Sequence, residues 1–313
     1  MRRSTRPPTR IERWPTPDDD FLDVHRIDAP PGAPRLLVLH GLEGTIRSHY
    51  AGGLLHEAQQ RGWAADLLIF RSCGDEPNRA LRLYHSGETS DLDFVVRRLL
   101  ADDPARPFFI AGVSLGGNVL LKWLGEQGER VPPQLLSAAA VSVPFDLARG
   151  SRYLDRGFSR VYQAHFLRSL RRKALEKSGR FPDSIRADVV LRPRTLYDFD
   201  DLVTAPVHGF RDADDYYARS SSLPYLARIR LRTLLLSARD DPFLPSDVLD
   251  EVREVAHLNP SLHLEFVEHG GHVGFISGVM PWRPFYYAEW RVAEFLSGSI
   301  TTSPAVGADR DRS

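Results

Sequence analysis

The chain has 313 residues, of which 42% are hydrophobic and 26% are charged, enough for one large α/β domain or two small ones. Its 41 basic and 41 acidic side chains give a formal net charge of zero, which argues against a partner recognised by overall charge, such as nucleic acid. The single cysteine, Cys73, excludes an intramolecular disulfide and fits a reducing compartment.

Both ends of the chain have loop composition. Residues 1–20 are rich in Pro, Arg and Asp, so we expect an N-terminal extension over 1–30 and a flexible tail over 298–313. The basic start lacks the apolar core of a signal peptide, and no apolar run is long enough to predict a transmembrane helix. We therefore expect a cytoplasmic protein, and a monomer because no zipper pattern occurs.

Between these ends, apolar strands alternate with helical stretches. The predicted strands span 34–41, 64–74, 107–114, 136–145, 231–238 and 261–272. The predicted helices span 48–63, 90–103, a stretch from about Gly117, and 284–296. Such alternation predicts an α/β fold with a mostly parallel sheet covered by helices on both faces, split here into 31–147 and 227–297. Chemistry in such sheets lies at the carboxyl ends of the strands.

Residues 148–226 interrupt the alternation and predict a mainly helical cap. Within residues 158–179, four apolar side chains recur every fourth position: Phe158, Tyr162, Phe166 and Leu170. The basic residues of this stretch lie largely elsewhere, and two interpretations stay open. They form a solvated helix surface, or they attract anionic lipid or acyl substrate and give the cap a peripheral lipid contact.

Ser114 lies at the point where an apolar strand turns into a helix, between Gly112 and Gly116. A strand, a Gly-x-Ser-x-Gly turn and a helix form a nucleophile elbow, which exposes the serine hydroxyl above the sheet. Backbone N–H groups at the start of the helix point toward the same spot. The pattern predicts Ser114 as a catalytic nucleophile.

A serine nucleophile needs a base and an orienting acid, which follow the elbow in the order acid, then histidine. Asp240 and Asp241 follow the strand at 231–238, and successive side chains point in different directions, so one of them serves the histidine. His269 and His272 follow the last strand, and the two glycines before His272 favour it as the base.

The oxyanion of a tetrahedral intermediate needs two donors. We expect the N–H of Leu115, which follows the nucleophile, and the N–H of Leu42 in the glycine-flanked stretch "HGLEG" at 40–44. His40 is the first residue of this loop, and its place at a strand end favours bracing the loop over acting as the base.

These segments together resemble the α/β-hydrolase superfamily, in the YheT-like branch that includes the embryogenesis-associated hydrolases. The matching motifs are "HGLEG", "YHSGETSDL" (84–92), "GVSLGGN" (112–118), "YDFDDLVTAPVHGFRDADDYY" (197–217), "ARDDPF" (238–243) and "GGHVGF" (270–275). The resemblance implies an α/β-hydrolase fold and a serine carboxylesterase or lipid-ester hydrolase. Its triad would be Ser114, Asp241 and His272, and it would use no cofactor or metal. The acid of this superfamily often opens a D-x-x-x-P turn, which favours Asp241 over Asp240.

One motif departs from the branch, since "FRSCG" (70–74) carries Ser72 where R-G-C is usual. We expect Cys73 to pack in a loop without a catalytic role. In "TAPVHGF", His208 or Phe210 either contributes to the pocket or fixes the cap to the core.

The sequence thus predicts hydrolysis of a small-molecule acyl ester, with apolar pocket residues from 273–282 and the cap. A thioesterase or an acyltransferase would use the same triad and stays an alternative. A metal hydrolase is disfavoured because no HExxH or similar ligand spacing occurs. A binding protein without activity is the remaining alternative, although all three triad positions hold competent residues.

Overall fold

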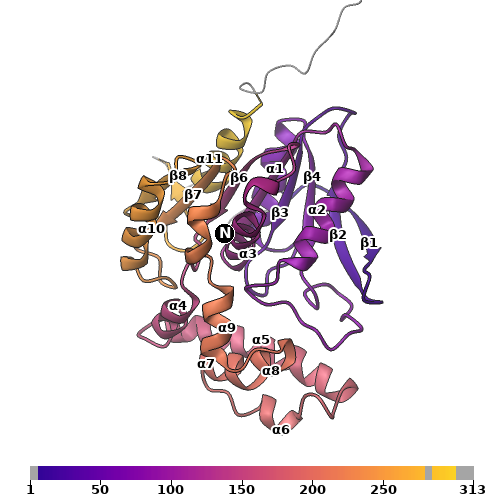
Figure 1. The fold of residues 1–313 in the computed structure, drawn as a ribbon, viewed down its shortest axis with the longest axis vertical. Coiled ribbons are helices and arrows are strands. Elements are labelled where there is room, and N and C mark those ends of the chain that lie inside the picture. The colour runs from indigo at the N-terminus through magenta and orange to yellow at the C-terminus, as the bar shows by residue number, and fades with distance from the viewer. Residues whose placement is uncertain (1–5, 279–283, 301–313) are drawn as a thin grey trace, which may run out of the picture.

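Eight strands form one sheet in the order β1-β2-β4-β3-β5-β6-β7-β8 (Figure 1). The computed structural model describes residues 6–278 and 284–300. The strands are β1 (Arg10–Pro15), β2 (Phe21–Ile27), β3 (Arg35–Leu39), β4 (Ala64–Ile69), β5 (Phe108–Val113), β6 (Leu135–Val141), β7 (Thr233–Ala238) and β8 (Leu262–Val267). β3 to β8 run parallel, whereas β1 and β2 are antiparallel to their neighbours.

Burial on both faces explains why these strands were recognisable as apolar runs. Every residue of β4, β5 and β7 is buried, because helices cover both sides of the sheet. This confirms the predicted mostly parallel α/β architecture. The antiparallel pair β9 (Ile276–Ser277) and β10 (Phe285–Tyr286) forms a separate small sheet.

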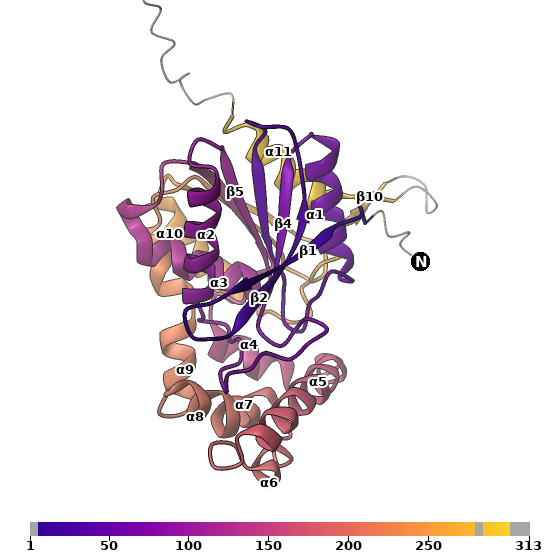
Figure 2. The same cartoon turned by 90° about the vertical axis from the view of Figure 1, so that its right-hand side faces the viewer.

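Two groups of helices enclose the sheet (Figure 2). α1 (His49–Gln60) and α11 (Tyr287–Ser297) pack together on one face. The other face carries α2 (Ser90–Asp102), α3 (Leu115–Gln127), α10 (Asp247–His257) and the short helices η1 (Gly128–Arg130) and η3 (Leu223–Arg228). Of these, α10 was not predicted. None of the helices within residues 6–278 and 284–300 has the length and apolar character to cross a bilayer.

The segment between β6 and β7 is helical and lies at one end of the molecule, the lower end in Figures 1 and 2. We call residues 147–220 the cap. Its elements are α4 (Leu147–Leu154), α5 (Ser159–Arg180), α6 (Ala187–Val190), α7 (Leu196–Phe199), the π-helical turn η2 (Asp200–Thr204), α8 (Ala205–His208) and α9 (Ala213–Ser220). The cap has its own apolar cluster, which consists of Leu167, Ala174, Ile185, Val190, Phe199 and Val203.

The N-terminal segment differs from our expectation of an extension over 1–30. β1 and β2 lie inside it and extend the main sheet beyond β4. These strands were not predicted because charged residues interrupt their apolar pattern. β1 is an edge strand, and Trp14 is its one buried residue. In β2, Arg26 lies on the buried side because its guanidinium pairs with the buried Asp66, at 2.7 Å.

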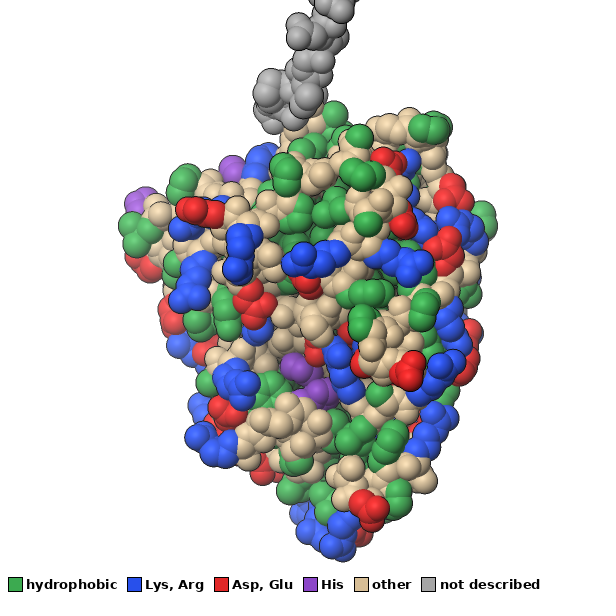
Figure 3. All heavy atoms as spheres, turned by 45° about the vertical axis from the view of Figure 1, so that its right-hand side comes forward, with side chains coloured by type: hydrophobic (Ala, Val, Ile, Leu, Met, Phe, Trp, Pro, Cys, Tyr) green, Lys and Arg blue, Asp and Glu red, His purple; other side chains and the backbone are tan. Residues whose placement is uncertain are grey.

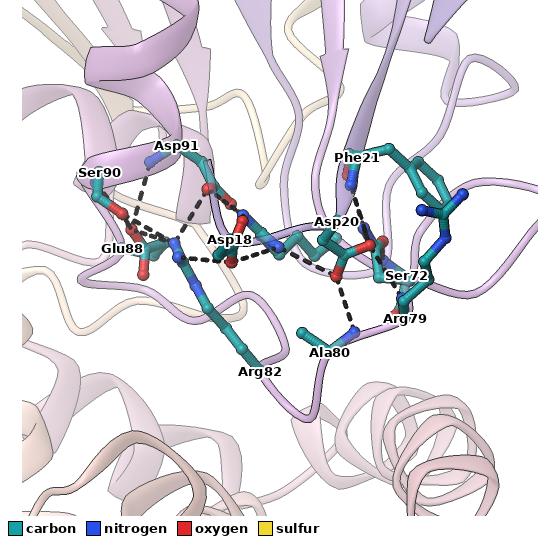
Figure 4. Close-up of polar contacts among 12 residues, drawn as sticks. Asp18, Asp20, Phe21, Ser72, Arg79, Ala80, Arg82, Glu88, Ser90 and Asp91 are labelled. Carbon is teal, nitrogen blue, oxygen red and sulfur yellow. Dashed lines mark hydrogen bonds and ion pairs between the residues drawn. The ribbon is translucent and has the colours of Figure 1, made fainter. Parts of the chain in front are cut away.

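A buried arginine joins this hairpin to the rest of the sheet. Arg71, two residues after the end of β4, is 1% exposed and donates to both carboxylate oxygens of Asp91 in α2, at 2.8 and 2.9 Å. It also donates to Asp18 and Asp20 in the turn between β1 and β2, both at 3.1 Å. Figure 4 shows these three aspartates converging from the turn and from α2. The network ties three elements together.

We expect Arg71→Met to lower the free energy of unfolding by about 3–5 kcal/mol, because it leaves the buried carboxylates of Asp20 and Asp91 without this cation. Urea unfolding measures the change. The matched control is Arg97→Met, which removes an exposed pair with Asp93 on α2 and should cost less than about 1 kcal/mol. Equal losses for the two variants would contradict the importance of burial here.

Ser72 occupies the position where the related pattern has glycine, and its backbone explains that preference. Its φ is 60°, in the left-handed region that glycine adopts without strain. The Ser72 hydroxyl is also buried without a hydrogen-bond partner among the described residues. The backbone N–H of Ser72 donates to Asn78 Oδ1 at 2.6 Å, which holds the turn despite the strain.

We expect Ser72→Gly to raise the free energy of unfolding by about 1 kcal/mol, since it relieves the strain and removes an unpaired hydroxyl. Ser72→Ala serves as the comparison, because alanine removes the hydroxyl but keeps the strained φ. Thermal unfolding should rank the glycine variant above the alanine variant; the reverse order would disprove the strain.

Candidate active site

Ser114 forms a sharp turn between the end of β5 and the start of α3, with φ 54° and ψ −121°. The turn is possible because the backbones of β5, the start of α3 and the end of β3 contact one another where side chains would not fit. A Cβ on Gly112 would lie 2.4 Å from the carbonyl oxygen of Gly116, and a Cβ on Gly116 would lie 2.5 Å from that of His40. Both glycines are therefore required by close approach.

The structure brings Ser114, His272 and Asp241 together in one hydrogen-bonded line. His272 Nε2 lies 2.9 Å from Ser114 Oγ, and His272 Nδ1 lies 2.7 Å from Asp241 Oδ2. The second oxygen of Asp241 accepts the N–H of Phe243 at 2.8 Å. Asp241 is 2% exposed, so its carboxylate is fixed on both sides and shielded from water.

The neighbouring candidates, Asp240 and His269, lie outside this line. Asp240 accepts the N–H groups of Gly270 and Gly271, at 2.9 and 2.8 Å, and lies 3.3 Å from His269 Nδ1. The side chain of His269 is 90% exposed. Although partial burial raises the pKa of Asp240, the two glycine N–H groups lower it below its usual value. Asp240 therefore holds the loop that carries His272.

The two residues predicted to supply the oxyanion donors both line the cavity beside Ser114. Leu42 and Leu115 line this cavity, and within residues 6–278 and 284–300 neither backbone N–H donates a hydrogen bond. The N–H groups on either side of Leu42 are occupied: Gly41 donates to the Tyr50 hydroxyl and Glu43 to the Tyr84 hydroxyl, both at 2.8 Å. The loop thus leaves the N–H of Leu42 available for a ligand.

His40 braces this loop. Its Nε2 accepts the N–H of Phe70 at 3.1 Å, so its Nδ1 carries the proton and donates to the Gly41 carbonyl at 2.8 Å. The ring is fully buried, and burial lowers the pKa of His40 to about 4. With both nitrogens used by backbone groups, His40 holds the loop and does not reach Ser114.

An ion pair between the loop and the cap was missed from sequence. Glu43 accepts Lys173 Nζ of α5 at 2.7 Å, the Tyr84 hydroxyl at 2.7 Å and the Ser169 hydroxyl. Burial raises the pKa of Glu43, but Lys173 and the two hydroxyls outweigh it and lower the pKa below its usual value. Lys173 also donates to Cys73 Sγ at 3.1 Å. The cap therefore positions the loop that carries Leu42.

Cys73 is buried, and burial raises the pKa of its thiol to about 11. Its environment is that of a packed thiol. Among the described residues, no group of three or more His, Cys, Asp or Glu side chains could hold a metal ion.

A cavity of about 320 Å³ opens onto Ser114 and His272. Its lining includes apolar side chains of the cap: Leu147, Leu154, Phe166, Leu170, Leu196 and Phe199. Of the stretch predicted to supply pocket residues, Val273 lines the cavity and Phe275 is buried in the core, while 279–282 lie outside the described residues. His208 lines the cavity; Phe210 instead packs on Tyr216, with ring centroids 5.2 Å apart.

The predicted apolar row of α5 runs from the surface to this cavity. Phe158 is 71% exposed and contacts Tyr162, which in turn contacts Phe243, with centroid distances of 5.7 and 4.7 Å. The Phe243 ring lies 4.4 Å from the ring of His272. Phe166 and Leu170 of this row line the cavity, and Leu170 also packs against the apolar cluster of the cap.

Comparison with known proteins identifies the family of the chain. The family described as "alpha/beta hydrolase fold" matches residues 34–279. The Escherichia coli (strain K12) protein named "Putative esterase YheT" is 40% identical over 291 residues, covering 91% of this chain and 84% of its own. Phospholipase ABHD3 of Mus musculus is 32% identical over 283 residues, covering 90% of this chain and 67% of its own.

Among solved structures, the Pyrococcus furiosus esterase Pf2001 has the same fold, with a TM-score of 0.59 and 19% identity. The likeness covers 93% of this chain and 91% of that one.

Proposed function

The chain belongs to the alpha/beta hydrolase fold family, in the YheT-like branch, and from that premise we propose that it is a serine hydrolase cleaving carboxylic esters of acyl or lipid type. The observation that carries the proposal is the hydrogen-bonded line from Ser114 through His272 to Asp241, beside a cavity lined by Leu42 and Leu115, whose backbone N–H groups donate no hydrogen bond within residues 6–278 and 284–300. Each part of this arrangement has a role in acyl transfer.

In the first half of the reaction, Ser114 Oγ attacks the acyl carbon while His272 Nε2 takes the hydroxyl proton. The carbonyl oxygen becomes an oxyanion that accepts the N–H groups of Leu42 and Leu115, and each such donor is worth about 10²–10³ in rate. The carbon–oxygen bond to the alcohol then breaks, and His272 returns the proton to the leaving alcohol. The acyl group remains on Ser114.

In the second half, a water molecule replaces the alcohol. His272 takes one proton from the water as it attacks the acyl carbon, and the same two N–H groups hold the oxyanion. The bond to Ser114 Oγ breaks, and His272 returns the proton to Ser114. Asp241 accepts His272 Nδ1–H throughout, which fixes the tautomer and stabilises the imidazolium that forms twice in each cycle.

The cavity lining supports an acyl group as the part of the substrate next to Ser114. Leucine and phenylalanine side chains of the cap stabilise a hydrocarbon chain by removing it from water, at roughly 25 cal/mol per Å². The similarity to a protein named as a phospholipase supports the same class of substrate. The proposed reaction uses no cofactor.

Hydrolysis of p-nitrophenyl esters from acetyl to palmitoyl tests the assignment. We expect Ser114→Ala and Asp241→Asn each to lower kcat by about 10⁴-fold or more, because one removes the nucleophile and the other the orienting acceptor. Asp240→Asn is the matched control and should lower kcat by less than about tenfold. The opposite ranking of the two aspartates would transfer the orienting role to Asp240.

We also propose that the outer face of α5 contacts an anionic lipid surface. Five arginines line a groove there: Arg160, Arg168, Arg171, Arg172 and Arg194. Within the described parts of the chain, none of their side chains has an ion pair. Val161 on the same helix is 59% exposed, and Phe158, which directly precedes the helix, is 71% exposed. Exposed apolar and cationic side chains together favour a membrane surface over nucleic acid, and both kinds occur on the cap in Figure 3.

Co-sedimentation with vesicles of phosphatidylglycerol and phosphatidylcholine tests this contact. We expect Arg168→Gln combined with Arg172→Gln to weaken binding by about 30-fold, since each cation near an anionic surface contributes about 1 kcal/mol. The control combines Arg97→Gln with Arg211→Gln, two exposed arginines that pair with Asp93 and Asp212. Equal loss in the control, or equal binding to pure phosphatidylcholine, would refute the contact.

A further inference from the structure

Phe243 contacts two of the three triad residues at once. Its backbone N–H donates to Asp241 Oδ1 at 2.8 Å. Its ring lies against the ring of His272, with centroids 4.4 Å apart and the ring planes at 45° to each other. Within residues 6–278 and 284–300, no other aromatic ring contacts the ring of His272. Phe243 also lines the cavity, yet its side chain has no role in the reaction steps proposed for the triad.

The hydrogen bonds of His272 do not by themselves fix its ring. His272 follows Gly270 and Gly271, two residues without a side chain to hold the loop, and its ring has one hydrogen bond at each nitrogen, to Asp241 and to Ser114. In the acyl-enzyme, Ser114 Oγ carries the acyl group and has no proton to donate to His272 Nε2. The bond to Asp241 then remains, and it fixes the position of Nδ1 but lets the ring pivot about that point. A contact against the ring itself removes this freedom.

The cap restrains Phe243 on its side chain and on its backbone. The rings of Tyr162 and Phe166 of α5 contact the Phe243 ring, with centroid distances of 4.7 and 6.0 Å. Ser159, the first residue of α5, donates its hydroxyl to the carbonyl of Pro242, which directly precedes Phe243. Because both parts of the residue are held, Phe243 is a fixed support for the ring that it contacts.

We propose that Phe243 is a positioning residue for the base, whose ring keeps His272 Nε2 directed at Ser114 and, in the second half of the reaction, at the attacking water. The inference rests on the ester hydrolysis proposed above. Proton transfer requires the reacting atoms at hydrogen-bond distance and in line, so a small displacement of the base slows it. A ring that pivots occupies the productive orientation for part of the time, and kcat falls by that fraction.

Contact with the acyl chain is a different role that the position of Phe243 in the cavity lining would also allow. A side chain that only binds the acyl chain acts on KM, and acts more strongly on long chains than on acetyl. A side chain that positions the base acts on kcat, and equally for short and long chains, because His272 moves the same protons for every ester. The two roles are therefore separable by kinetics.

The test measures kcat and KM for p-nitrophenyl acetate and p-nitrophenyl hexanoate. We expect Phe243→Leu to lower kcat about tenfold with both esters, the upper end of what one aromatic contact contributes. Phe243→Tyr keeps the ring and should keep kcat within about twofold of wild type. Phe166→Leu, which alters a cavity ring that contacts Phe243, should raise KM for the hexanoate more than it lowers kcat. Phe210→Leu makes the same change at a ring that packs on Tyr216 and should keep both constants.

Three kinetic results would contradict the positioning role: a kcat for acetate within about twofold of wild type in Phe243→Leu, a loss confined to the hexanoate, or an equal loss in Phe243→Tyr. Phe243→Met also lacks the ring and should reproduce the loss, which guards against misfolding of the leucine variant.

Crystal structures of wild type and Phe243→Leu supply a readout that needs no hydrolysis. We expect His272 Nε2 at hydrogen-bond distance from Ser114 Oγ in wild type. In the variant, that orientation should be the minor one, since a tenfold loss corresponds to an occupancy of roughly one tenth. An unchanged His272 in the variant would overturn the proposal. If wild type hydrolysed no ester, the proposed function would fail, whereas the positioning role would stand or fall on this comparison.

Discussion

The left-handed backbone of Ser114 is the constraint on which the rest of the site depends. A non-glycine residue in this conformation costs about 1–3 kcal/mol, which the surrounding structure must supply. Close packing of backbone against backbone offsets this cost. β5, the start of α3 and the end of β3 approach so closely that no Cβ fits at Gly112 or Gly116. The buried parallel strands hold these segments rigidly. The serine hydroxyl is consequently presented at a fixed place above the sheet.

Neighbouring residues in the sequence have different positioning roles around the Ser114 hydroxyl. Asp241 and Asp240 are neighbours, yet one orients the ring of His272 while the other fastens the backbone of the loop that carries it. His40 and Glu43 similarly share one short loop, where His40 secures its beginning and Glu43 its exit. Both pairs consist of positioning residues, and the groups that would touch substrate are the ring of His272 and the N–H of Leu42, which these residues hold in place. A fixed framework of this kind reduces the reorganisation needed during reaction.

Much of the fold and the triad geometry followed from the sequence because both leave local patterns. Apolar runs predicted six strands, and Gly-x-Ser-x-Gly after a strand predicted the turn at Ser114. The same reasoning missed β2. Its Arg26 forms a buried ion pair with Asp66, and a charged residue in the strand gives it the pattern of a surface segment. Lys173 was missed because its partner lies 130 residues away. A signal did exist: in this arginine-rich chain Lys122, Lys173 and Lys177 are the only lysines, and all three are largely buried.

The pair Glu43–Lys173 couples the cap to the loop that carries Leu42. Moving α5 away from the core would separate two charges whose side chains are 9% and 11% exposed. The loop would keep its hydrogen bonds to Tyr50, Tyr84 and His40, all in the core, but the buried carboxylate of Glu43 would lose its counter-charge. Because an unpaired buried charge is strongly destabilising, this one pair makes the stability of the loop depend on the position of the cap.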